Sequence, residues 1–307
     1  MKILVVGAGA IGGYFGAKLA QAGRDITFLV RPSRAAQLQR DGLQIISPEG
    51  NLTIQPKTIT SQEIHSSFDA ILLSVKAPSL NSAIDDMKPA VGPDTIICPA
   101  LNGLQHIAAL SKAFGQRTVL GGVAFISTML DDQGRILQLN KSQKLTYGEL
   151  DGQITPRIQA FHQTMSNAGF DAELSNHIMQ DMWDKWVLIA TLGLNTCLLN
   201  GNIGQINSVL DGDAVILQSI DECASIARAS GYPTSKAVVD MLQQTGIDKN
   251  SKLTSSMFRD MQQGANVEVE AILGDLLKHG HAHQLKTPIL QAACVRLRIY
   301  QKSRSVS

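Results

Sequence analysis

Two residues in the second half of the chain, Lys185 and Glu268, are of types that move protons. Lys185 lies in the segment DMWDKWVLIATL, where a predicted helix changes from polar to almost wholly apolar residues. An ammonium at such a boundary is partly desolvated, which lowers its pKa from about 10.4 and makes proton transfer easier. The simpler interpretation, a lysine that reaches from a helix start to solvent, is favoured by the pattern alone. Glu268 has a rival in Glu270, and either can be an ordinary charge on a solvated helix face.

A second pattern with chemical meaning lies near the N-terminus, where Gly7, Gly9 and Gly12 have the spacing G-x-G-x-x-G. They follow a short apolar run, residues 3–6, that is typical of a parallel strand buried on both faces, and they open a predicted helix over residues 10–22. In that context Gly7 permits a tight turn, Gly9 lets the backbone approach a pyrophosphate, and Gly12 lets the helix pack closely. The pattern predicts a dinucleotide site at a helix N-terminus, formed by Gly7, Ala8, Gly9, Ala10, Ile11 and Gly12.

The end of the second predicted strand, residues 26–30, indicates which dinucleotide binds. An acidic residue there would hold the ribose 2′-hydroxyl of NAD, whereas arginine suits the 2′-phosphate of NADP. The sequence offers Arg31 and Arg34, and Asp25 precedes the strand instead of ending it. We therefore expect NADPH as the cofactor, the alternative being that both arginines are solvated surface charges.

These residues need elements that position them, and strand and helix signals alternate through the first half of the chain. The pattern predicts a doubly wound, Rossmann-type, mainly parallel sheet, with ligands at the carboxyl ends of its strands. Lys76 and Asn102 follow predicted strands at such ends, although a solvated lysine and an ordinary Asn-Gly turn are the simpler interpretations. The expected strands are residues 3–6, 26–30, 71–75 and 95–98, with a hairpin around residues 48–50. Later strand-like runs, residues 119–128, 135–139 and 144–147, are expected to extend this sheet antiparallel.

From Ser175 onward the sequence is typical of helices. We expect a dinucleotide-binding domain over residues 1–174 and an all-helical substrate and catalytic domain over residues 175–307, with a cleft between them for the substrate. Helices are predicted near residues 176–200, 212–230, 234–243 and 255–279, with turns at Gly201, residues 231–233 and Gly280.

Composition sets limits on the class of protein. A length of 307 residues with 44% hydrophobic residues predicts about two domains with substantial cores. A net charge of +1, without basic runs, argues against nucleic acid as a partner. The longest nearly apolar stretch, residues 186–199, is shorter than the roughly 20 residues that span a bilayer. Scattered cysteines and an N-terminus without room for a signal peptide indicate a cytoplasmic protein. No metal site is expected, because Gly280 interrupts the alternating histidines at 279–283.

Over nearly its whole length the chain resembles the ketopantoate reductase family. The resemblance rests on GAGAIGG at the start, SVKAPS after the third buried strand, LNG near 102, W-x-K at 183–185, and SSMFRD with Glu268 and Gly274 downstream. It implies NADPH-dependent reduction of the 2-oxo group of ketopantoate to pantoate, the precursor of pantothenate and coenzyme A. It implies that Lys185 is the proton donor and that Glu268 is an acidic partner near the nicotinamide ribose and the substrate. It implies that Asn102 contacts both the cofactor and the substrate. Lys76 would contact the cofactor, and Ser256 would offer the substrate a hydroxyl.

The chain departs from the family at two positions on the lysine helix. Ile189 and Gly193 stand where the family usually has asparagines that face the substrate. Thr196, Asn200 or Asn202 are candidates to supply the missing polarity. Otherwise an apolar wall at Ile189 indicates a related 2-oxo acid or another less polar carbonyl compound.

Two alternatives to ketopantoate reduction stay open. One is an NAD(P)-dependent reductase of a different 2-oxo or β-hydroxy acid, in the manner of the hydroxyisobutyrate dehydrogenase relatives. The other is a dinucleotide-sensing protein without catalysis, against which Lys185 and Glu268 argue. Monomer and homodimer are both compatible with the sequence.

Overall fold

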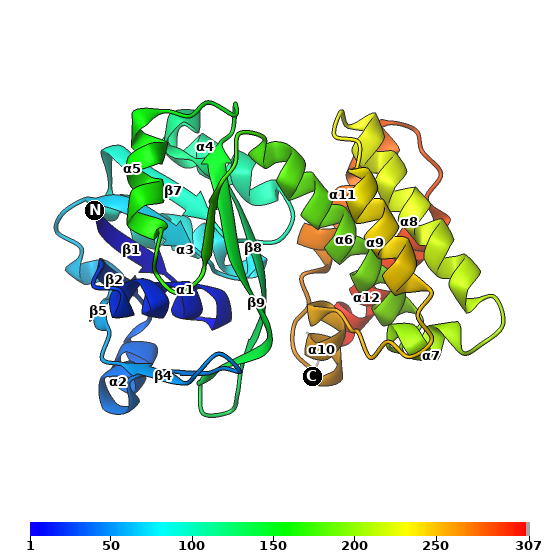
Figure 1. The fold of residues 1–307 in the computed structure, drawn as a ribbon, viewed down its shortest axis with the longest axis horizontal. Coiled ribbons are helices and arrows are strands. Elements are labelled where there is room, and N and C mark those ends of the chain that lie inside the picture. Colours follow the sequence, from blue (N-terminus) through cyan, green and yellow to red (C-terminus); the bar gives the residue numbers. More distant parts are fainter. Residues whose placement is uncertain (305–307) are drawn as a thin grey trace. The chain divides into compact units, whose positions relative to one another are not determined.

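The computed structural model describes residues 1–304, so the last three residues of the predicted C-terminal domain lie outside the described part. The chain forms two compact units. Unit 1 consists of Met1–Leu101 and His106–Ile178, and unit 2 consists of Asn102–Gln105 and the chain from Met179 onward. Unit 1 is an α/β unit with a parallel sheet, and unit 2 is helical (Figure 1), so the predicted fold class is confirmed.

The first sheet of unit 1 is entirely parallel. Its strands are β1 (Lys2–Val6), β2 (Asp25–Leu29), β5 (Lys57–Ile59), β6 (Phe68–Leu73) and β7 (Val91–Pro99). Their order is β5-β2-β1-β6-β7, so the strand order reverses at β1. In doubly wound sheets ligands bind at the carboxyl ends of the strands beside such a reversal, and the glycine turn follows β1 at that end.

Helices and 3-10 turns connect these strands. They are α1 (Ala10–Gln21), α2 (Pro32–Asp41), η1 (Ser61–Glu63), η2 (Ala77–Ser79), α3 (Leu80–Met87), η3 (Lys88–Ala90), α4 (Gln105–Phe114), η4 (Gln116–Thr118) and α5 (Pro156–Met165).

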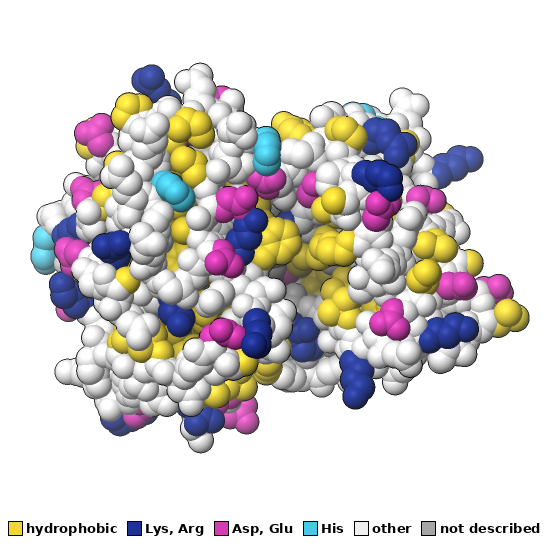
Figure 2. Space-filling view, viewed as in Figure 1, with side chains coloured by type: hydrophobic (Ala, Val, Ile, Leu, Met, Phe, Trp, Pro, Cys, Tyr) yellow, Lys and Arg dark blue, Asp and Glu magenta, His cyan; other side chains and the backbone are white. Residues whose placement is uncertain are grey.

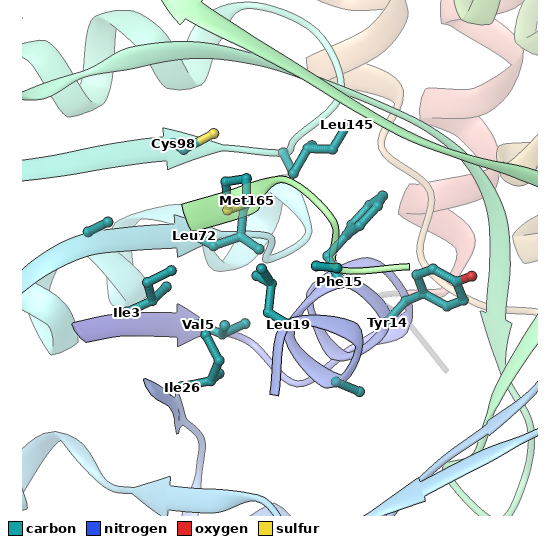
Figure 3. Close-up of a cluster of buried hydrophobic side chains, with 14 of the residues drawn as sticks. Ile3, Val5, Tyr14, Phe15, Leu19, Ile26, Leu72, Cys98, Leu145 and Met165 are labelled. Carbon is teal, nitrogen blue, oxygen red and sulfur yellow. The ribbon is translucent and has the colours of Figure 1, made fainter. Parts of the chain in front are cut away.

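Strand β1 is buried on both faces, which explains its unbroken apolar sequence. Ile3 and Val5 point into one hydrophobic cluster, which includes side chains of α1 and α5 (Figure 3). Leu4 and Val6 point into a second cluster, formed with α3 and α4. Because successive strand residues face opposite sides, both layers of helices are packed against this one strand.

The later strands form a second sheet, and the prediction that they extend the first sheet is wrong. This sheet contains β3 (Leu43–Ile46), β4 (Leu52–Ile54), β8 (Leu120–Leu130), β9 (Ile136–Glu149) and β10 (Asp171–Leu174). The predicted hairpin is confirmed as the antiparallel pair β3–β4. Strand β9 is continuous over 14 residues, and it pairs with β8 on one side and with β3 and β10 on the other. Both edges of β9 are thereby occupied, and β8 meets the first sheet at a single bridge, Ile97 to Val119.

Unit 2 is built around a long helix with a nearly continuous buried core. Its helices are α6 (Ile178–Leu198), α7 (Ile203–Asn207), α8 (Gly212–Ala229), α9 (Lys236–Gly246), α10 (Ser256–Gln262), the π-helix η5 (Glu270–Gly274), α11 (Asp275–Ala282) and α12 (Pro288–Arg304). Trp186 of α6 is among the largest fully buried side chains of the chain.

Two predicted boundaries in unit 2 are wrong. The single helix expected over 255–279 is broken after α10, where Gly264 has φ +65°, a left-handed conformation that suits glycine. The turn expected at Gly280 is absent, because α11 continues to Ala282 and a last helix, α12, follows. Gly280 instead allows close packing, since a Cβ there would lie 3.1 Å from the Ile226 side chain.

The surface and the cysteines are consistent with the composition. Acidic and basic side chains are interspersed on the face shown in Figure 2. The four cysteines are buried and free of disulfides. Within residues 1–304, no helix has the length and apolarity to cross a membrane, and no group of histidine, cysteine and acidic residues is arranged to hold a metal ion.

A buried carboxylate, Glu222 of α8, fixes the start of α12. It accepts hydrogen bonds from the N–H groups of Ile289 at 3.2 Å and Leu290 at 3.0 Å. We expect Glu222→Ala to lower the free energy of unfolding by about 2 kcal/mol, because two helix-terminal donors lose a charged acceptor in the core. Glu222→Gln, which retains an acceptor oxygen, should lose less. Denaturant unfolding measures both variants, and equal losses would contradict the capping role.

Candidate active site

The glycine turn after β1 has the geometry that its spacing predicts. Gly7 has φ +95°, which a side chain disfavours. A Cβ on Gly12 would lie 1.9 Å from Ser74 Oγ and 2.5 Å from the Gly7 carbonyl oxygen, so α1 packs too closely for any side chain. A Cβ on Gly9 would have nothing within 4 Å, which leaves open space beside the first turn of α1.

The start of α1 fits a dinucleotide phosphate. Gly9 is the N-cap residue and makes no side-chain cap, so the backbone N–H groups at the beginning of α1, from Ala10 and Ile11 onward, have no side-chain acceptor from the cap. Ala8 is buried beneath the turn. Open space, N–H groups and the positive end of the helix dipole together suit a bound anion.

Replacement of Gly9 and of Gly12 by alanine should have different effects. Gly9→Ala should fold normally and weaken dinucleotide binding by about tenfold or more, because its methyl group would enter the space that the phosphate needs. Gly12→Ala should destabilise unit 1, because its methyl group would overlap Ser74 and the Gly7 backbone. Thermal unfolding and titration of the dinucleotide measure the two effects. Equal losses of stability in both variants would contradict the assignment of Gly9.

The two arginines after β2 have different surroundings. Arg31 is exposed and directly precedes α2. Arg34 is half-buried and donates to the carbonyl oxygens of Ala8 at 3.2 Å and Gly134 at 3.0 Å, and burial lowers the pKa of its guanidinium. Arg34 thus ties the glycine turn to the β8–β9 hairpin and is not a solvated surface charge. Asp25 opens β2 and pairs with Lys57 at 3.0 Å, at the strand end remote from the glycine turn.

The next strand end carries Lys76. Strand β6 ends at Leu73, two residues before the predicted end, and Lys76 is the exposed residue that precedes the turn Ala77–Ser79. Ser74, two residues before Lys76, contacts the glycine turn, with its hydroxyl 3.2 Å from the Gly7 carbonyl oxygen. Lys76 therefore follows the strand that lies beside β1 in the sheet.

Lys185 is buried in the first half of α6, with 9% of its surface exposed. Burial lowers the pKa of its ammonium to about 8, and the negative charge of Glu268 acts in the opposite direction. A lysine whose ammonium extended into solvent would have a larger exposed fraction. Lys185 thus combines a buried ammonium with a carboxylate partner, a combination that suits a proton donor near neutral pH.

Glu268, and not Glu270, is the acidic residue whose charge acts on this lysine. Asn102 Nδ2 donates to Glu268 Oε2 at 3.4 Å, so Lys185, Glu268 and Asn102 form one group within unit 2. Glu270 is exposed and accepts hydrogen bonds from Arg298 at 2.7 Å and 2.9 Å. The rival carboxylate is therefore engaged elsewhere.

Beyond Lys185, the same face of α6 is apolar. Ile189 is half-buried one turn further on. A Cβ at Gly193 would lie 2.5 Å from the terminal methyl carbon of Met257, a buried residue of α10. Met257 therefore fills the space that a side chain at 193 would occupy. The sequence gives Met257 only the helical spacing of a core residue, so this role could not be found without the structure.

The polar residues proposed to replace the missing amides are engaged in local hydrogen bonds. The Thr196 hydroxyl donates to the Leu192 carbonyl at 2.7 Å and lies 2.8 Å from Ser255 Oγ. Asn202 caps α7, where it accepts from the Gln205 N–H at 2.8 Å. Asn200 Oδ1 accepts from Gln262 at 3.4 Å. None of these three side chains is directed by its hydrogen bonds toward Lys185.

Of the two serines before Met257, Ser255 is the structural one. Ser255 is buried, and its hydroxyl accepts from the Phe258 N–H at 3.0 Å as the cap of α10. Ser256, the predicted substrate contact, is the exposed first residue of that helix.

Comparison with known proteins identifies the family. Residues 3–152 match the family model described as "Ketopantoate reductase PanE/ApbA", and residues 177–301 match "Ketopantoate reductase PanE/ApbA C terminal". The chain belongs to the ketopantoate reductase family. The resemblance inferred from the sequence motifs is thereby confirmed.

Relatives of this ketopantoate reductase family member cover almost its whole length. It is 35% identical over 304 residues to a Bacillus subtilis (strain 168) protein called "Uncharacterized oxidoreductase YkpB", covering 99% of this chain and 100% of that one. It is 26% identical to a 2-dehydropantoate 2-reductase of Mesorhizobium japonicum, covering 97% of each chain. The crystal structure of a 2-dehydropantoate 2-reductase from Geobacter metallireducens GS-15 has a TM-score of 0.88 and 25% identity, covering 97% of this chain and 99% of that one.

A solved structure with a different printed activity also has this fold. A D-mandelate dehydrogenase, solved with NADH and anilino(oxo)acetate, has a TM-score of 0.87 at 20% identity and covers 99% of this chain and 100% of that one. Family membership indicates that this chain is an oxidoreductase that acts on CH–OH groups.

Proposed function

We propose that the protein is a cytoplasmic enzyme that reduces a small 2-oxo acid with NADPH, with ketopantoate as the first candidate substrate. Its product would then be pantoate, for pantothenate and coenzyme A synthesis. The observation that carries the proposal is Lys185, a buried ammonium whose pKa is lowered to about 8, next to Glu268 and Asn102. Family membership supplies the reaction class.

The residues of unit 2 suit the proton transfer in this reaction. When bound, NADPH supplies a hydride to the carbonyl carbon, and negative charge develops on the carbonyl oxygen. The Lys185 ammonium stabilises that charge and donates a proton, so an N–H bond breaks as the O–H bond of the alcohol forms. Glu268 favours the protonated form of Lys185 before the transfer. Asn102 holds the carboxylate of Glu268 through its amide.

Arg31 supports NADPH as the cofactor, because it is an exposed cation next to the strand end where the ribose of a dinucleotide is read. We expect Arg31→Ala to lower the preference for NADPH over NADH by about tenfold, through loss of a charge-assisted contact to the 2′-phosphate. Lys57→Ala, on β5, is the matched control, because Lys57 pairs with Asp25 at the end of β2 that is remote from the glycine turn. Binding titrations with both nucleotides measure the ratio, and an unchanged ratio in Arg31→Ala would contradict the assignment.

A less polar 2-oxo acid is the second candidate substrate, and the apolar face of α6 favours it. Ile189 and the Met257 methyl group over Gly193 offer no hydrogen bond to the terminal hydroxyl of ketopantoate. A substrate hydroxyl buried against this wall without a partner would cost about 1 to 3 kcal/mol. A branched 2-oxo acid without that hydroxyl, such as 2-oxoisovalerate, avoids this cost.

The loss of NADPH absorbance with ketopantoate and with 2-oxoisovalerate tests the two candidates. A higher kcat/KM for ketopantoate supports the family substrate, and a higher value for 2-oxoisovalerate supports the second candidate. Tight binding of NADPH without turnover of any 2-oxo acid would reject both and favour a dinucleotide-sensing protein.

A further inference from the structure

The helix that follows Glu268 begins with an unusual turn. The Ile272 N–H donates to the Glu268 carbonyl at 3.1 Å, so Glu268 stands at the first hydrogen bond of this helix. Residues Glu270–Gly274 are π-helical, and the Asp275 N–H reaches back five residues to the Glu270 carbonyl. A π-helical turn inserts one residue into a helix and is uncommon, and such turns occur frequently at functional sites.

One side of the π-helical turn is bonded to the lysine helix through Trp186. The indole Nε1 of Trp186 donates to the Ile272 carbonyl oxygen at 2.8 Å. Trp186 is 1% exposed and is the residue next to Lys185. A buried indole N–H requires a partner, and here that partner is the backbone of the turn that begins two residues after Glu268.

The other side of the turn is bonded to the segment that carries Asn102. Gly103 has φ +73°, and a Cβ there would lie 2.2 Å from the Ala271 carbonyl oxygen, so only glycine allows this backbone approach. Gln105 Nε2 donates to Asp275 Oδ1 at 2.8 Å at the end of the same turn. Residues 102–105 accordingly belong to unit 2 with the turn, although the chain around them belongs to unit 1.

We infer that the π-helical turn Glu270–Gly274 is a positioning element, and that Trp186 is the positioning residue that fixes Glu268 relative to Lys185. The backbone of this turn is hydrogen-bonded to Trp186, the residue beside Lys185, and contacts Gly103, the residue beside Asn102, while its helix starts at Glu268. Displacement of the turn would therefore separate the carboxylate from the ammonium. This inference rests on the proposed function, because it assigns the turn to the same proton donor.

The variant Trp186→Phe removes the indole N–H and keeps an aromatic ring in the core. We expect kcat with the preferred 2-oxo acid to fall by about 10- to 100-fold, since a small misplacement of catalytic groups has effects of this size. The KM for NADPH should not change. In a Glu268→Gln background, Trp186→Phe should cause no further loss of kcat, because both changes remove the same interaction.

Trp183→Phe is the matched control. Trp183 is also buried on α6, with its ring stacked on Tyr232 at 5.6 Å and in contact with Trp186. The Trp183→Phe variant loses a similar amount of ring packing, so we expect a similar loss of thermal stability. Because it keeps the hydrogen bond from Trp186 to the Ile272 carbonyl, we expect little change in kcat. Gln105→Leu removes the hydrogen bond to Asp275 on the other side of the turn, at a half-buried position. We expect this variant also to have a lower kcat, as Trp186→Phe does.

A measurement without turnover separates this inference from the proposed function. The pKa of Lys185 in the free protein can be followed by NMR of isotopically labelled lysine side chains. Glu268 is the charged group that raises this pKa, so Trp186→Phe should lower it and Trp183→Phe should not. If wild-type protein reduces no 2-oxo acid but this shift occurs, the proposed function fails and the positioning stands. An unchanged Lys185 pKa in Trp186→Phe, or losses of kcat that multiply in full with Glu268→Gln, would overturn the inference.

Discussion

Replacement of Lys185 by alanine is expected to lower kcat with the preferred 2-oxo acid by about 10³-fold, the range for loss of a general acid that also stabilises an oxyanion. The reason is the burial of this ammonium, which makes it a better acid than an exposed lysine, with a pKa of about 8. NADPH binding should be unchanged, because the glycine turn that fits the dinucleotide belongs to unit 1.

The control for this experiment is an exposed lysine of the same unit, Lys302→Ala on α12. Stopped-flow measurement of a single turnover, with NADPH binding titrated separately, distinguishes the chemical step from cofactor affinity. A Lys185→Ala enzyme that retains more than about one tenth of wild-type kcat would contradict the assignment of Lys185 as proton donor.

Replacement of Glu268 by glutamine should lower kcat by about 10²-fold and change its pH dependence. Reduction requires protonated Lys185, so kcat/KM of the wild-type enzyme should fall as pH rises through the Lys185 pKa of about 8. Glu268 raises that pKa, and glutamine removes the negative charge. The Lys185 pKa is therefore lower in the variant, and the fall in kcat/KM should begin at lower pH.

The pH profiles of wild type, Glu268→Gln and Glu270→Gln measure this effect. Glu270 pairs with Arg298 and is exposed, so its replacement should leave the profile where it is. A Glu268→Gln profile that does not move to lower pH, or an identical shift in Glu270→Gln, would contradict the assignment of Glu268 as the carboxylate that acts on Lys185.

The parts of the site that depend on local sequence were predictable. The turn GAGAIG specifies much of its own geometry, since the left-handed Gly7 and the close approach of Gly12 to the Gly7 carbonyl follow from backbone sterics within the turn, whereas the contact of Gly12 with Ser74 comes from a distant segment. The apolar residues that follow Lys185 indicated partial desolvation, but the pattern alone favoured a lysine that reaches solvent, so its burial became clear only in the structure. The roles of Lys185 and Glu268 were available through the family resemblance, and no spacing rule connects residues so distant in the sequence.

The remaining features depend on contacts between distant segments. The π-helical turn has no sequence signature, and its partner Trp186 reads as an ordinary core residue of an apolar helix. Met257 fills the space at Gly193 because α10 packs against α6, a contact that helical periodicity cannot specify. The second sheet was missed for the same reason, since strand signals fix the existence of β8 and β9 but not the strands they pair with.

Transfer of a labelled hydride is the most direct test of the central claim, that this protein reduces a 2-oxo acid with NADPH. NADPH that carries deuterium at the transferable position of the nicotinamide would be incubated with the enzyme and with ketopantoate or 2-oxoisovalerate. The account predicts a 2-hydroxy acid with deuterium bonded to the former carbonyl carbon, formed in equal amount to the NADP⁺ produced. Bound NADPH that remains reduced, with no deuterated hydroxy acid from either substrate, would contradict it.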